Sequence, residues 1–331
     1  MITREVLEKR EYEFLSDFAS KASESKGRLI HEEKCSVRTD YQRDRDRIIH
    51  SKAFRRLMHK TQVFLSPEGD HYRTRLTHTI EVSQIARTIA RGICANEDLT
   101  EAIAMGHDLG HTPFGHSGES VLNKIHPGGF RHNEQSLRVV DYLETREDRR
   151  GMNLTWEVRD GIRNHTGSML PSTIEGQIVR ISDRIAYINH DIDDALRSGI
   201  ITEKDLPERC IEILGDSHKK RIDTLVKDMI SNSMGRSEAG LTEEKSEAMN
   251  ALRTFMFRNV YLNHDVKKVE DLHKVSIVIK SLYEYFIENP ERLPLEYFNM
   301  IDEFGAAELS KDYIAGMTDR YALTIYEKIF G

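Results

Sequence analysis

The distribution of apolar and polar residues along this chain follows the period of an α-helix. Apolar residues recur every three or four positions, and no alternating stretch persists beyond four or five residues. The clearest case is 177–197, where isoleucines at 178, 181, 185, 188 and 192 form one side of a helix. We therefore expect an all-α fold.

Similar periodicity marks the other expected helices. They span residues 1–26, 46–64, 77–90, 99–107, 137–143 and 154–165, followed by further helical pattern from 201 onward. Gly199 is expected to end the helix at 177–197, because glycine is common just past a helix C-terminus. We expect a helical core at 1–200 and an appended helical C-terminal region at 201–331.

Composition excludes several classes of protein. With 331 residues, 38% of them hydrophobic and 31% charged, the chain has the composition of an ordinary globular protein. Its apolar runs are far shorter than the roughly 20 residues that cross a membrane, and residues 1–10 lack the apolar core of a signal peptide. We expect a cytoplasmic protein with no membrane partner.

The spacing of the cysteines and the distribution of charge limit which metal, redox and nucleic-acid-binding sites the chain can contain. Cys35, Cys94 and Cys210 form no CxxC pair, which argues against a zinc ribbon, a redox motif or a disulfide framework. The net charge of −7 gives no overall attraction to nucleic acid. However, residues 38–75 contain ten Lys or Arg against five acids, so this segment could bind an anionic ligand.

Candidate catalytic side chains gather in 107–116, which reads HDLGHTPFGH. A His-Asp pair opens this segment, and two further histidines follow at positions 111 and 116. Glycine and proline at 110, 113 and 115 interrupt helical periodicity. We therefore expect His107 and Asp108 to close a helix, with the other two histidines on a tight loop.

Several polar side chains are expected to face the interior. His78 continues the apolar stripe of its helix. His107 lies one turn after Ile103, and Asp108 lies one turn after Ala104. Buried polar groups need partners. Taken alone, each histidine would be interpreted as a core residue and each aspartate as a helix cap. Together with Asp183 from a later helix, these residues indicate a divalent metal site. Imidazole and carboxylate ligands suit Mn²⁺, Fe²⁺, Zn²⁺, Ni²⁺ or, less readily, Mg²⁺.

Three motifs of this chain together resemble the HD-domain superfamily of metal-dependent phosphohydrolases. They are the H…HD…D pattern with its loop at 107–116, the FRHNEQS run at 130–136 and the helical segment 183–191. In particular, they are similar to the deoxynucleoside triphosphate triphosphohydrolases of the bacterial dGTPase-like family. The resemblance covers residues 38–200, and the C-terminal part resembles the helical region associated with that family.

The resemblance implies a reaction and a cofactor. His78, His107, Asp108 and Asp183 would bind a divalent ion, Mn²⁺ or Mg²⁺ first and Fe²⁺, Ni²⁺, Co²⁺ or Zn²⁺ otherwise. Water would attack the α-phosphorus of a dNTP, releasing a deoxynucleoside and tripolyphosphate. The expected substrate is dGTP, although the residues leave the base preference open.

The same resemblance implies roles in catalysis and substrate binding. His132 would give a proton to the leaving 5′-oxygen and would be held by the carboxylate of Glu119. The resemblance assigns further residues to the substrate: Arg75, His111 and His116 to the phosphates, Tyr187 to the sugar at C2′, Asp191 and Gln62 to the 3′-hydroxyl, and Arg184 to an open role. A ring close to C2′ would exclude a 2′-hydroxyl and so favour deoxynucleotides.

Partners and alternative functions are less constrained. Relatives in this family are commonly homo-oligomers, often hexamers, and some respond to a second, allosteric dNTP or to single-stranded DNA. The alternatives are another HD phosphohydrolase, such as a nucleotidase or an alarmone or cyclic-nucleotide hydrolase, and a non-catalytic module that binds nucleotides or nucleic acid through 38–75. Arg253 and Arg258 are candidates for reaching a phosphate, whereas His165 and His190 are interpreted as structural.

Overall fold

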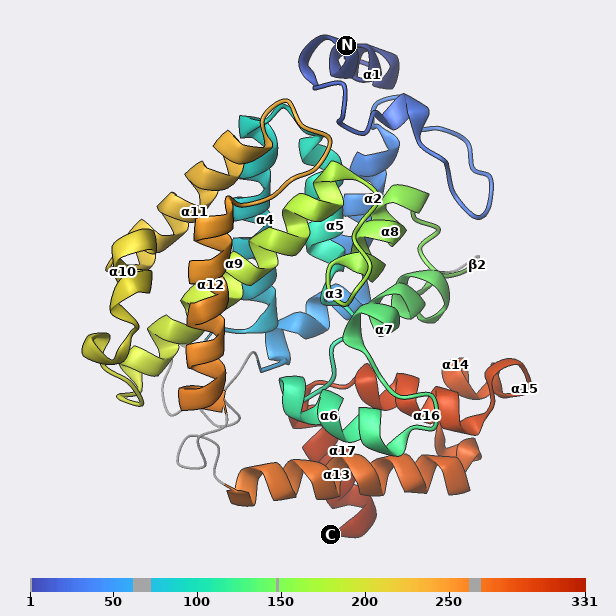
Figure 1. Cartoon of the computed structure of the whole chain (residues 1–331). Coiled ribbons are helices and arrows are strands. Elements are labelled where there is room, and N and C mark those ends of the chain that lie inside the picture. The colour runs from blue at the N-terminus through green and yellow to red at the C-terminus, as the bar shows by residue number, and fades with distance from the viewer. Residues whose placement is uncertain (1, 62–72, 147–148, 262–268) are drawn as a thin grey trace. The chain divides into compact units, whose positions relative to one another are not determined.

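Helices make up most of the protein in the computed structural model (Figure 1). The structure describes residues 2–61, 73–146, 149–261 and 269–331. Within these residues, the strands are β1 (Thr145–Arg146) and β2 (Arg149–Arg150), a short antiparallel pair. The prediction of an all-α fold is therefore confirmed. None of the described helices is both long and apolar enough to cross a membrane.

The chain forms two compact units, each assembled from three separate segments. The first unit comprises 1–49, 78–107 and 153–266, and the second comprises 50–77, 108–152 and 267–331. The chain therefore passes from one unit to the other between His107 and Asp108. The expected boundary at residue 200 remains a prediction.

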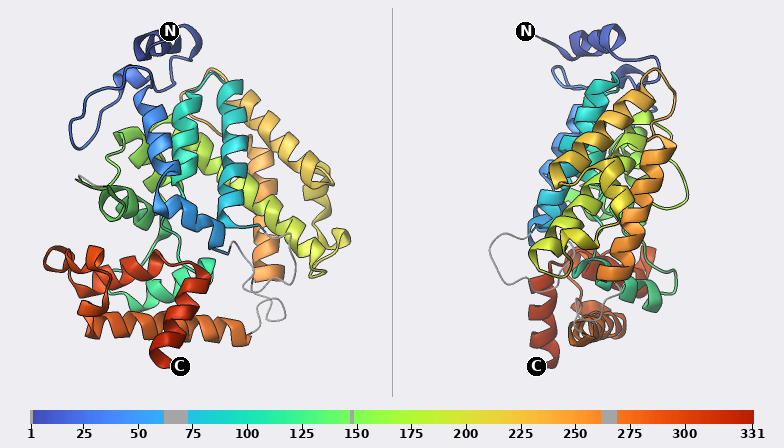
Figure 2. Two further views of the ribbon diagram at one scale, coloured as in Figure 1. Left: turned by 180° about the vertical axis from the view of Figure 1, so that it is seen from behind. Right: turned by 60° about the vertical axis from the view of Figure 1, so that its left-hand side comes forward.

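All three segments of the first unit contribute helices to it. They are α1 (Arg4–Phe14), α2 (Asp40–Ile49), α4 (Arg75–Gly92, from His78 onward), α5 (Glu97–Gly106), α8 (Trp156–Asn164), α9 (Ile174–Arg197), α10 (Glu208–Leu214), α11 (His218–Ser233) and α12 (Glu243–Met256), with short 3₁₀ or π turns at Ala22–Glu24, Glu203–Asp205 and Phe257–Tyr261. Most of α5 from Leu99 to Gly106 is buried. This helix contacts α2, α8 and α9, and two further views show α2 lying along it (Figure 2).

Two glycines allow α5 and α8 to approach closely. A Cβ atom added at Gly106 would lie 2.5 Å from Cδ1 of Ile162, and one added at Gly161 would lie 2.5 Å from Cδ1 of Ile103. Both distances are far below van der Waals contact, so a larger residue at either position would have to displace the isoleucine that faces it. The close crossing holds the C-terminal end of α5, which His107 directly follows.

The helix α9 carries the isoleucine stripe that the sequence predicts. It begins at Ile174, because Thr173 caps it by accepting a hydrogen bond from the backbone N–H of Gly176 at 3.1 Å. It ends at Arg197, where the predicted helix also ends. Its buried isoleucines are Ile174, Ile178, Ile185, Ile188 and Ile192, whereas Ile181 of the predicted stripe is partly exposed. The prediction for this segment is confirmed, with an earlier start.

The prediction of one continuous helix over 46–64 is wrong. The helix α2 ends at Ile49, and a new helix, α3, starts at Lys52. Ser51 separates them, because its side chain accepts a hydrogen bond from the backbone N–H of Phe54 at 3.0 Å and so caps α3. Apolar periodicity continues across this break, which is why the pattern alone missed it. The last three positions of the predicted helix lie outside the described residues.

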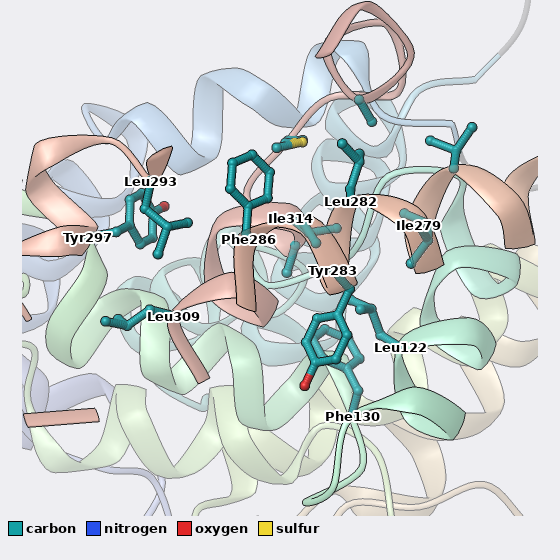
Figure 3. Packing of buried hydrophobic residues seen from close by; sticks show 14 of the residues in the cluster. Leu122, Phe130, Ile279, Leu282, Tyr283, Phe286, Leu293, Tyr297, Leu309 and Ile314 are labelled. Atoms are coloured by element: carbon teal, nitrogen blue, oxygen red, sulfur yellow. The ribbon is translucent and has the colours of Figure 1, made fainter. Parts of the chain in front are cut away.

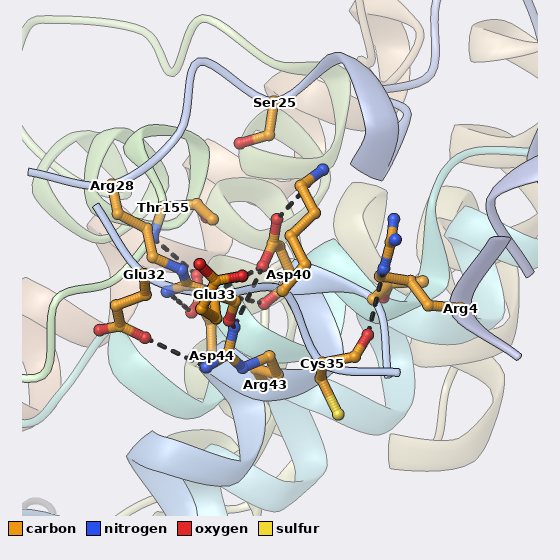
Figure 4. Close-up of polar contacts among 12 residues, drawn as sticks. Arg4, Ser25, Arg28, Glu32, Glu33, Cys35, Asp40, Arg43, Asp44 and Thr155 are labelled. Atoms are coloured by element: carbon orange, nitrogen blue, oxygen red, sulfur yellow. Dashed lines mark hydrogen bonds and ion pairs between the residues drawn. The ribbon is translucent and has the colours of Figure 1, made fainter. Parts of the chain in front are cut away.

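A buried cluster of charged side chains fastens the N-terminal segment within the first unit (Figure 4). Arg28 pairs with Asp44 and also donates to the backbone carbonyl of Asn153 at 2.6 Å. The other carboxylate oxygen of Asp44 accepts a hydrogen bond from the backbone N–H of Thr155 at 2.7 Å. Asp44 is completely buried, and burial raises its pKa, whereas the contacts with Arg28 and Thr155 offset part of the cost of removing its charge from water. The chain before α2 is thereby joined to the start of α8.

The second unit has a hydrophobic core around α13 (Figure 3). Its helices are α3 (Lys52–Arg56), α6 (Gly115–Ile125), α7 (His132–Arg138), α13 (Val269–Glu288), α14 (Leu295–Phe298), α15 (Ile301–Phe304), α16 (Ala306–Ala315) and α17 (Asp319–Phe330), with short 3₁₀ or π turns at Leu57–His59, Val139–Leu143 and Pro290–Arg292. The helix α13 contacts α6, α16 and α17. Leu122 of α6 is fully buried in this core with Ile279 and Leu282 of α13. The C-terminal helices therefore share one core with the segment that follows Asp108.

Candidate active site

Two histidines and an aspartate meet in the first unit. His107 follows the last residue of α5, His78 lies on α4, and Asp183 lies on α9. The Nε2 atom of His78 is 3.1 Å from Oδ1 of Asp183, and Nε2 of His107 is 3.9 Å from the same oxygen. Both histidines are buried. The structure thus brings together three of the four residues expected to bind a metal.

The remaining ring nitrogens of these histidines also have partners. Nδ1 of His107 donates a hydrogen bond to the backbone carbonyl of Ala104 at 2.6 Å. Nδ1 of His78 lies 3.5 Å from Nδ1 of His190, whose Nε2 lies 2.8 Å from Glu81. Such bonds orient an imidazole and leave its other nitrogen available to a metal ion. The Nε2 atoms of both histidines are therefore directed at Asp183.

The electrostatics of Asp183 also fit a cation site. Burial alone would raise the pKa of Asp183, but the hydrogen bond with His78 and the imidazoles of His107 and His165 hold this pKa well below its usual range. The carboxylate is therefore charged at neutral pH. One carboxylate with two imidazoles is a donor set that suits a divalent transition metal.

Asp108, the fourth expected ligand, directly follows His107 in the chain and belongs to the second unit. It is buried, and its Oδ2 accepts a hydrogen bond from Nη1 of Arg75 at 2.8 Å. Nε2 of His111 lies 4.0 Å from its Oδ1. Asp108, His111 and His132 each offer a potential ligand atom within 4.8 Å of the others. Within the second unit, Asp108 therefore lies close to His132, the expected catalytic histidine.

Three histidines cluster in the second unit beside Asp108. The rings of His111 and His132 are stacked, with centroids 4.4 Å apart and planes inclined by 14°. The ring of His116 meets that of His111 edge-on, with centroids 5.2 Å apart. Burial and the charges of Arg75 and His132 lower the pKa of His111 well below its usual value. His111 is therefore neutral while it stacks on His132.

Glu119 of α6 pairs with His132 at the start of α7. Its Oε1 lies 2.9 Å from Nδ1 of His132 and accepts a hydrogen bond from the backbone N–H of His132, also at 2.9 Å. Burial opposes the charge on both groups. The carboxylate nevertheless raises the pKa of His132, and the imidazole holds the pKa of Glu119 far below its usual range. The pairing therefore favours the protonated form of His132 and the ionised form of Glu119.

Gly110 allows the loop after Asp108 to pack against α7. A Cβ atom added at Gly110 would lie 2.1 Å from the backbone nitrogen of Ser136 and 2.7 Å from the carbonyl oxygen of His132. The backbone N–H of Gly110 donates to the hydroxyl of Ser136 at 2.9 Å. Only glycine permits this approach. The expected tight loop is thereby held against the helix that carries His132.

The expectation that His116 lies on this loop is wrong. The helix α6 begins at Gly115, so His116 occupies its first turn. The side chain of His116 is 65% exposed, and its Nδ1 lies 3.2 Å from Oε2 of Glu119. Gly115 starts the helix in a left-handed conformation that glycine tolerates, so it initiates the helix that it was expected to interrupt.

One face of α9 extends from Asp183 toward the residues expected at the sugar. Tyr187 and Asp191 follow at intervals of four residues. The carboxylates of Asp183 and Asp191 both contribute to raising the pKa of Tyr187. Burial is the main cause of the raised pKa of Tyr187, and the guanidinium of Arg253 opposes it. Arg253 of α12 therefore lies beside this face.

For the other residues predicted to bind substrate, the structure gives only their position and exposure. Arg184 lies next to Asp183 on α9 and is partly exposed, and Arg258 is exposed. Gln62 lies outside the described residues. Their assigned roles remain predictions.

Two residues taken as structural in the sequence lie at the site. The His165 ring is 5.1 Å from that of His107, and His190 is the partner of His78. His190 is seven residues after Asp183, which places both on nearly the same side of α9, and this spacing was a signal available in the sequence. His165 follows Ile162 by three residues and so continues the buried stripe of α8.

Comparison with known proteins agrees with this arrangement. Two protein-family models match the chain, one described as HD domain over residues 75–188 and one as phosphohydrolase-associated domain over 239–328. Among solved structures, a phosphohydrolase from Bacteroides thetaiotaomicron aligns with a TM-score of 0.52 and 16% identity, covering 86% of this chain and 67% of that one. This likeness shows a shared fold.

Curated relatives match over the whole chain. A deoxyguanosinetriphosphate triphosphohydrolase-like protein of Caldanaerobacter subterraneus subsp. tengcongensis is 60% identical over 330 residues, covering 100% of this chain and 96% of the relative. A protein of the same name from Desulfatibacillum aliphaticivorans is 49% identical over 350 residues, covering 100% of this chain and 98% of the relative.

Proposed function

The chain belongs to the HD-domain family of deoxyguanosinetriphosphate triphosphohydrolase-like hydrolases, and from this premise we propose that it hydrolyses deoxynucleoside triphosphates to a deoxynucleoside and tripolyphosphate, with dGTP as the first substrate. The observation that carries the proposal is the charged His132–Glu119 pair stacked on neutral His111. It supplies a proton donor close to Asp108, the aspartate of the HD motif.

The proposed cofactor is a divalent cation, Mn²⁺ or Mg²⁺, with Fe²⁺, Ni²⁺, Co²⁺ or Zn²⁺ as alternatives. His78, His107 and Asp183 would hold it, together with Asp108, which follows His107 in the chain. When bound, such an ion polarises a phosphate oxygen and lowers the pKa of water. The hydrogen bond from Nδ1 of His107 to the carbonyl of Ala104 orients the ring so that Nε2 is the nitrogen that would bind the ion.

His132 is the proposed general acid. In the reaction, the oxygen of water forms a bond to the α-phosphorus while the bond from phosphorus to the 5′-oxygen breaks. The leaving oxygen then takes a proton. Nδ1 of His132 faces Glu119, so Nε2 is the atom that would donate it. Glu119 keeps this proton available at neutral pH, because it raises the pKa of His132.

Arg75, His111 and His116 are the proposed phosphate contacts. A triphosphate carries several negative charges and requires cationic or donor groups. Arg75 supplies a buried guanidinium beside Asp108, and neutral His111 retains one N–H to donate. The exposed ring of His116 lies at the solvent side of the same cluster.

The face of α9 is proposed to bind the deoxyribose. Tyr187 would pack against C2′, where its ring would exclude a 2′-hydroxyl, and Asp191 would accept a hydrogen bond from the 3′-hydroxyl. Gln62 is the proposed partner of Asp191. The buried position of Asp191 and its location two turns from Asp183 support this assignment.

The product pattern tests the reaction. Purified protein is incubated with Mn²⁺ and each dNTP, and the products are identified by chromatography and ³¹P NMR. Tripolyphosphate with deoxynucleoside is the expected result, whereas pyrophosphate with dNMP, or orthophosphate with dNDP, contradicts the proposal. In ¹⁸O-labelled water, attack at the α-phosphorus places the label in tripolyphosphate. A label in the deoxynucleoside would indicate attack at the 5′-carbon instead.

A homo-oligomer, such as a hexamer, is the proposed assembly. A second dNTP or single-stranded DNA is the proposed allosteric ligand. Light scattering measures the assembly with and without nucleotides. Assays of the four dNTPs singly, in mixtures and with an oligonucleotide test regulation, because activity that appears only in mixtures requires a second nucleotide site.

A further inference from the structure

We propose that Asp319, at the first residue of the C-terminal helix α17, positions the catalytic loop that runs from His111 to Phe114, just before α6. It acts together with Lys60 and Thr61, and we call these three residues the brace. The inference rests on the proposed function, since it assigns a role in that same site. All three residues of the brace belong to the second unit, as does the loop.

Phe114 is the point at which Asp319 holds the loop. Its φ is 62° and its ψ is 23°, a left-handed conformation that bulky residues rarely adopt. Its backbone N–H donates to Oδ1 of Asp319 at 2.9 Å. Its side chain is buried in the core of the second unit, so the residue is held at both backbone and ring. The conformation therefore depends on contacts distant in sequence.

The second carboxylate oxygen of Asp319 fixes the carboxylate itself. Oδ2 accepts hydrogen bonds from the backbone N–H of Thr61 at 3.0 Å and from the hydroxyl of the same threonine. Three donors thus converge on one carboxylate, and hydrogen bonds to an ionised acceptor are stronger than neutral ones. Asp319 therefore has one orientation, in which it bridges Thr61 and Phe114.

Lys60 holds the other end of the loop. Its side chain is buried, and Nζ donates to the backbone carbonyl of His111 and to that of Ala315 at 2.8 Å. The backbone carbonyl of Lys60 in turn accepts a hydrogen bond from the N–H of Arg75 at 3.2 Å. The brace therefore links His111 and Arg75, two proposed phosphate contacts, to the C-terminal helices.

The position of this loop governs the catalytic pair. His111 stacks on His132, and α6 starts at the residue after Phe114 and carries Glu119. A shift of the loop would move the ring of His111 and the carboxylate of Glu119, which together orient His132. Displacements of about 1 Å at a reacting group can cost about 100-fold in rate. Asp319 is thus expected to control turnover without touching the substrate.

The test compares Asp319→Ala with Thr318→Ala. Thr318 caps the same helix by accepting from the N–H of Tyr321 at 3.3 Å, so its loss weakens α17 but leaves the brace intact. We expect amide hydrogen exchange of residues 112–118 to accelerate at least about tenfold in Asp319→Ala and less than about twofold in Thr318→Ala. The kcat for dGTP should fall roughly 10- to 100-fold in Asp319→Ala alone. Equal exchange and equal kcat in the two variants would overturn the proposal.

A third variant covers a failure of Asp319→Ala to fold. Asp319→Asn keeps an oxygen for the N–H of Phe114 but replaces the acceptor that faces Thr61 with an N–H₂ group. We expect exchange at Phe114 close to that of the natural protein and a kcat between those of the natural protein and Asp319→Ala. A kcat unchanged from that of the natural protein would contradict a bridging role. If the natural protein hydrolyses no dNTP, the proposed function fails, but the exchange comparison still decides whether the brace holds the loop.

Discussion

Glu119 holds His132 through both its backbone and its ring. One carboxylate oxygen accepts from the backbone N–H of His132 and lies 2.9 Å from Nδ1 of the same residue. The ring is therefore fixed in orientation and in charge by one group. This arrangement leads to the first prediction.

Glu119→Gln should shift the pH dependence of kcat toward lower pH. The natural pair raises the pKa of His132, so the protonated acid persists to higher pH and is lost as pH rises through that pKa. The amide removes the stabilising charge and lowers this pKa. We expect the alkaline limb of the profile to move to lower pH and kcat at pH 7 to fall roughly 100-fold. Glu303→Gln, which alters an exposed pair with Arg150, is the control and should leave the profile unchanged.

Removing a metal ligand should remove metal and activity together. His107→Ala removes an imidazole from the proposed donor set, and Asp183→Asn removes the negative charge and one of the two carboxylate oxygens. Metal content after dialysis, measured by mass spectrometry, should fall to background in both variants. His59→Ala changes an exposed histidine and should retain both properties. Full metal content in either ligand variant would show that the assignment is wrong.

His190→Ala should weaken metal binding without abolishing it. His190 contacts Nδ1 of His78 and orients its ring. Loss of such an orienting partner typically reduces metal affinity about 10- to 100-fold. Competition with a fluorescent chelator measures this change, and circular dichroism checks that the helices remain. An affinity within twofold of that of the natural protein would exclude the orienting role.

Tyr187→Ala should weaken the preference for deoxynucleotides. If the ring excludes a 2′-hydroxyl, its removal should lower the ratio of kcat/KM for dGTP to that for GTP by roughly tenfold or more. Tyr187→Phe keeps the ring and should keep the ratio. A ratio that stays constant in Tyr187→Ala would place sugar discrimination elsewhere.

Glu308→Gln should destabilise the protein in a pH-dependent manner. A hydrogen bond with His126, followed by the contact with Lys311, lowers the pKa of Glu308 to about 2. A lowered carboxylate pKa stabilises the fold above the unfolded value and loses this effect as pH falls toward 2. We expect urea unfolding to show a difference of about 1–2 kcal/mol at pH 6, after allowance for partial exposure, that disappears near pH 2. A difference independent of pH would indicate lost packing instead.

Much of the helical structure was predictable because helical periodicity is a local property. The helices expected at 99–107 and 177–197 followed from apolar spacing alone, and the structure confirms both as α5 and α9. The break at Ser51 did not follow, because a capping side chain replaces backbone bonds without changing the apolar pattern.

The site was predictable only in part, for a different reason. The metal-ligand motif is carried by short stretches of sequence, whereas the contacts of Asp319 with Thr61 join residues 258 positions apart. No spacing rule relates such residues, since their proximity results from tertiary packing. His190 lay between these cases, because its helical spacing from Asp183 was visible but its contact with His78 was not.

The regular spacing on α9 sets the distances between the proposed metal ligand Asp183 and the proposed sugar contacts Tyr187 and Asp191. Four residues advance an α-helix by about 6 Å, so the step from Asp183 to Tyr187 equals the step from Tyr187 to Asp191. A single-residue insertion between Asp183 and Tyr187 would rotate everything beyond it by about 100°. Evolution can therefore exchange side chains along this helix, but an insertion or deletion within the interval would turn the proposed sugar contacts away from the proposed metal ligand Asp183.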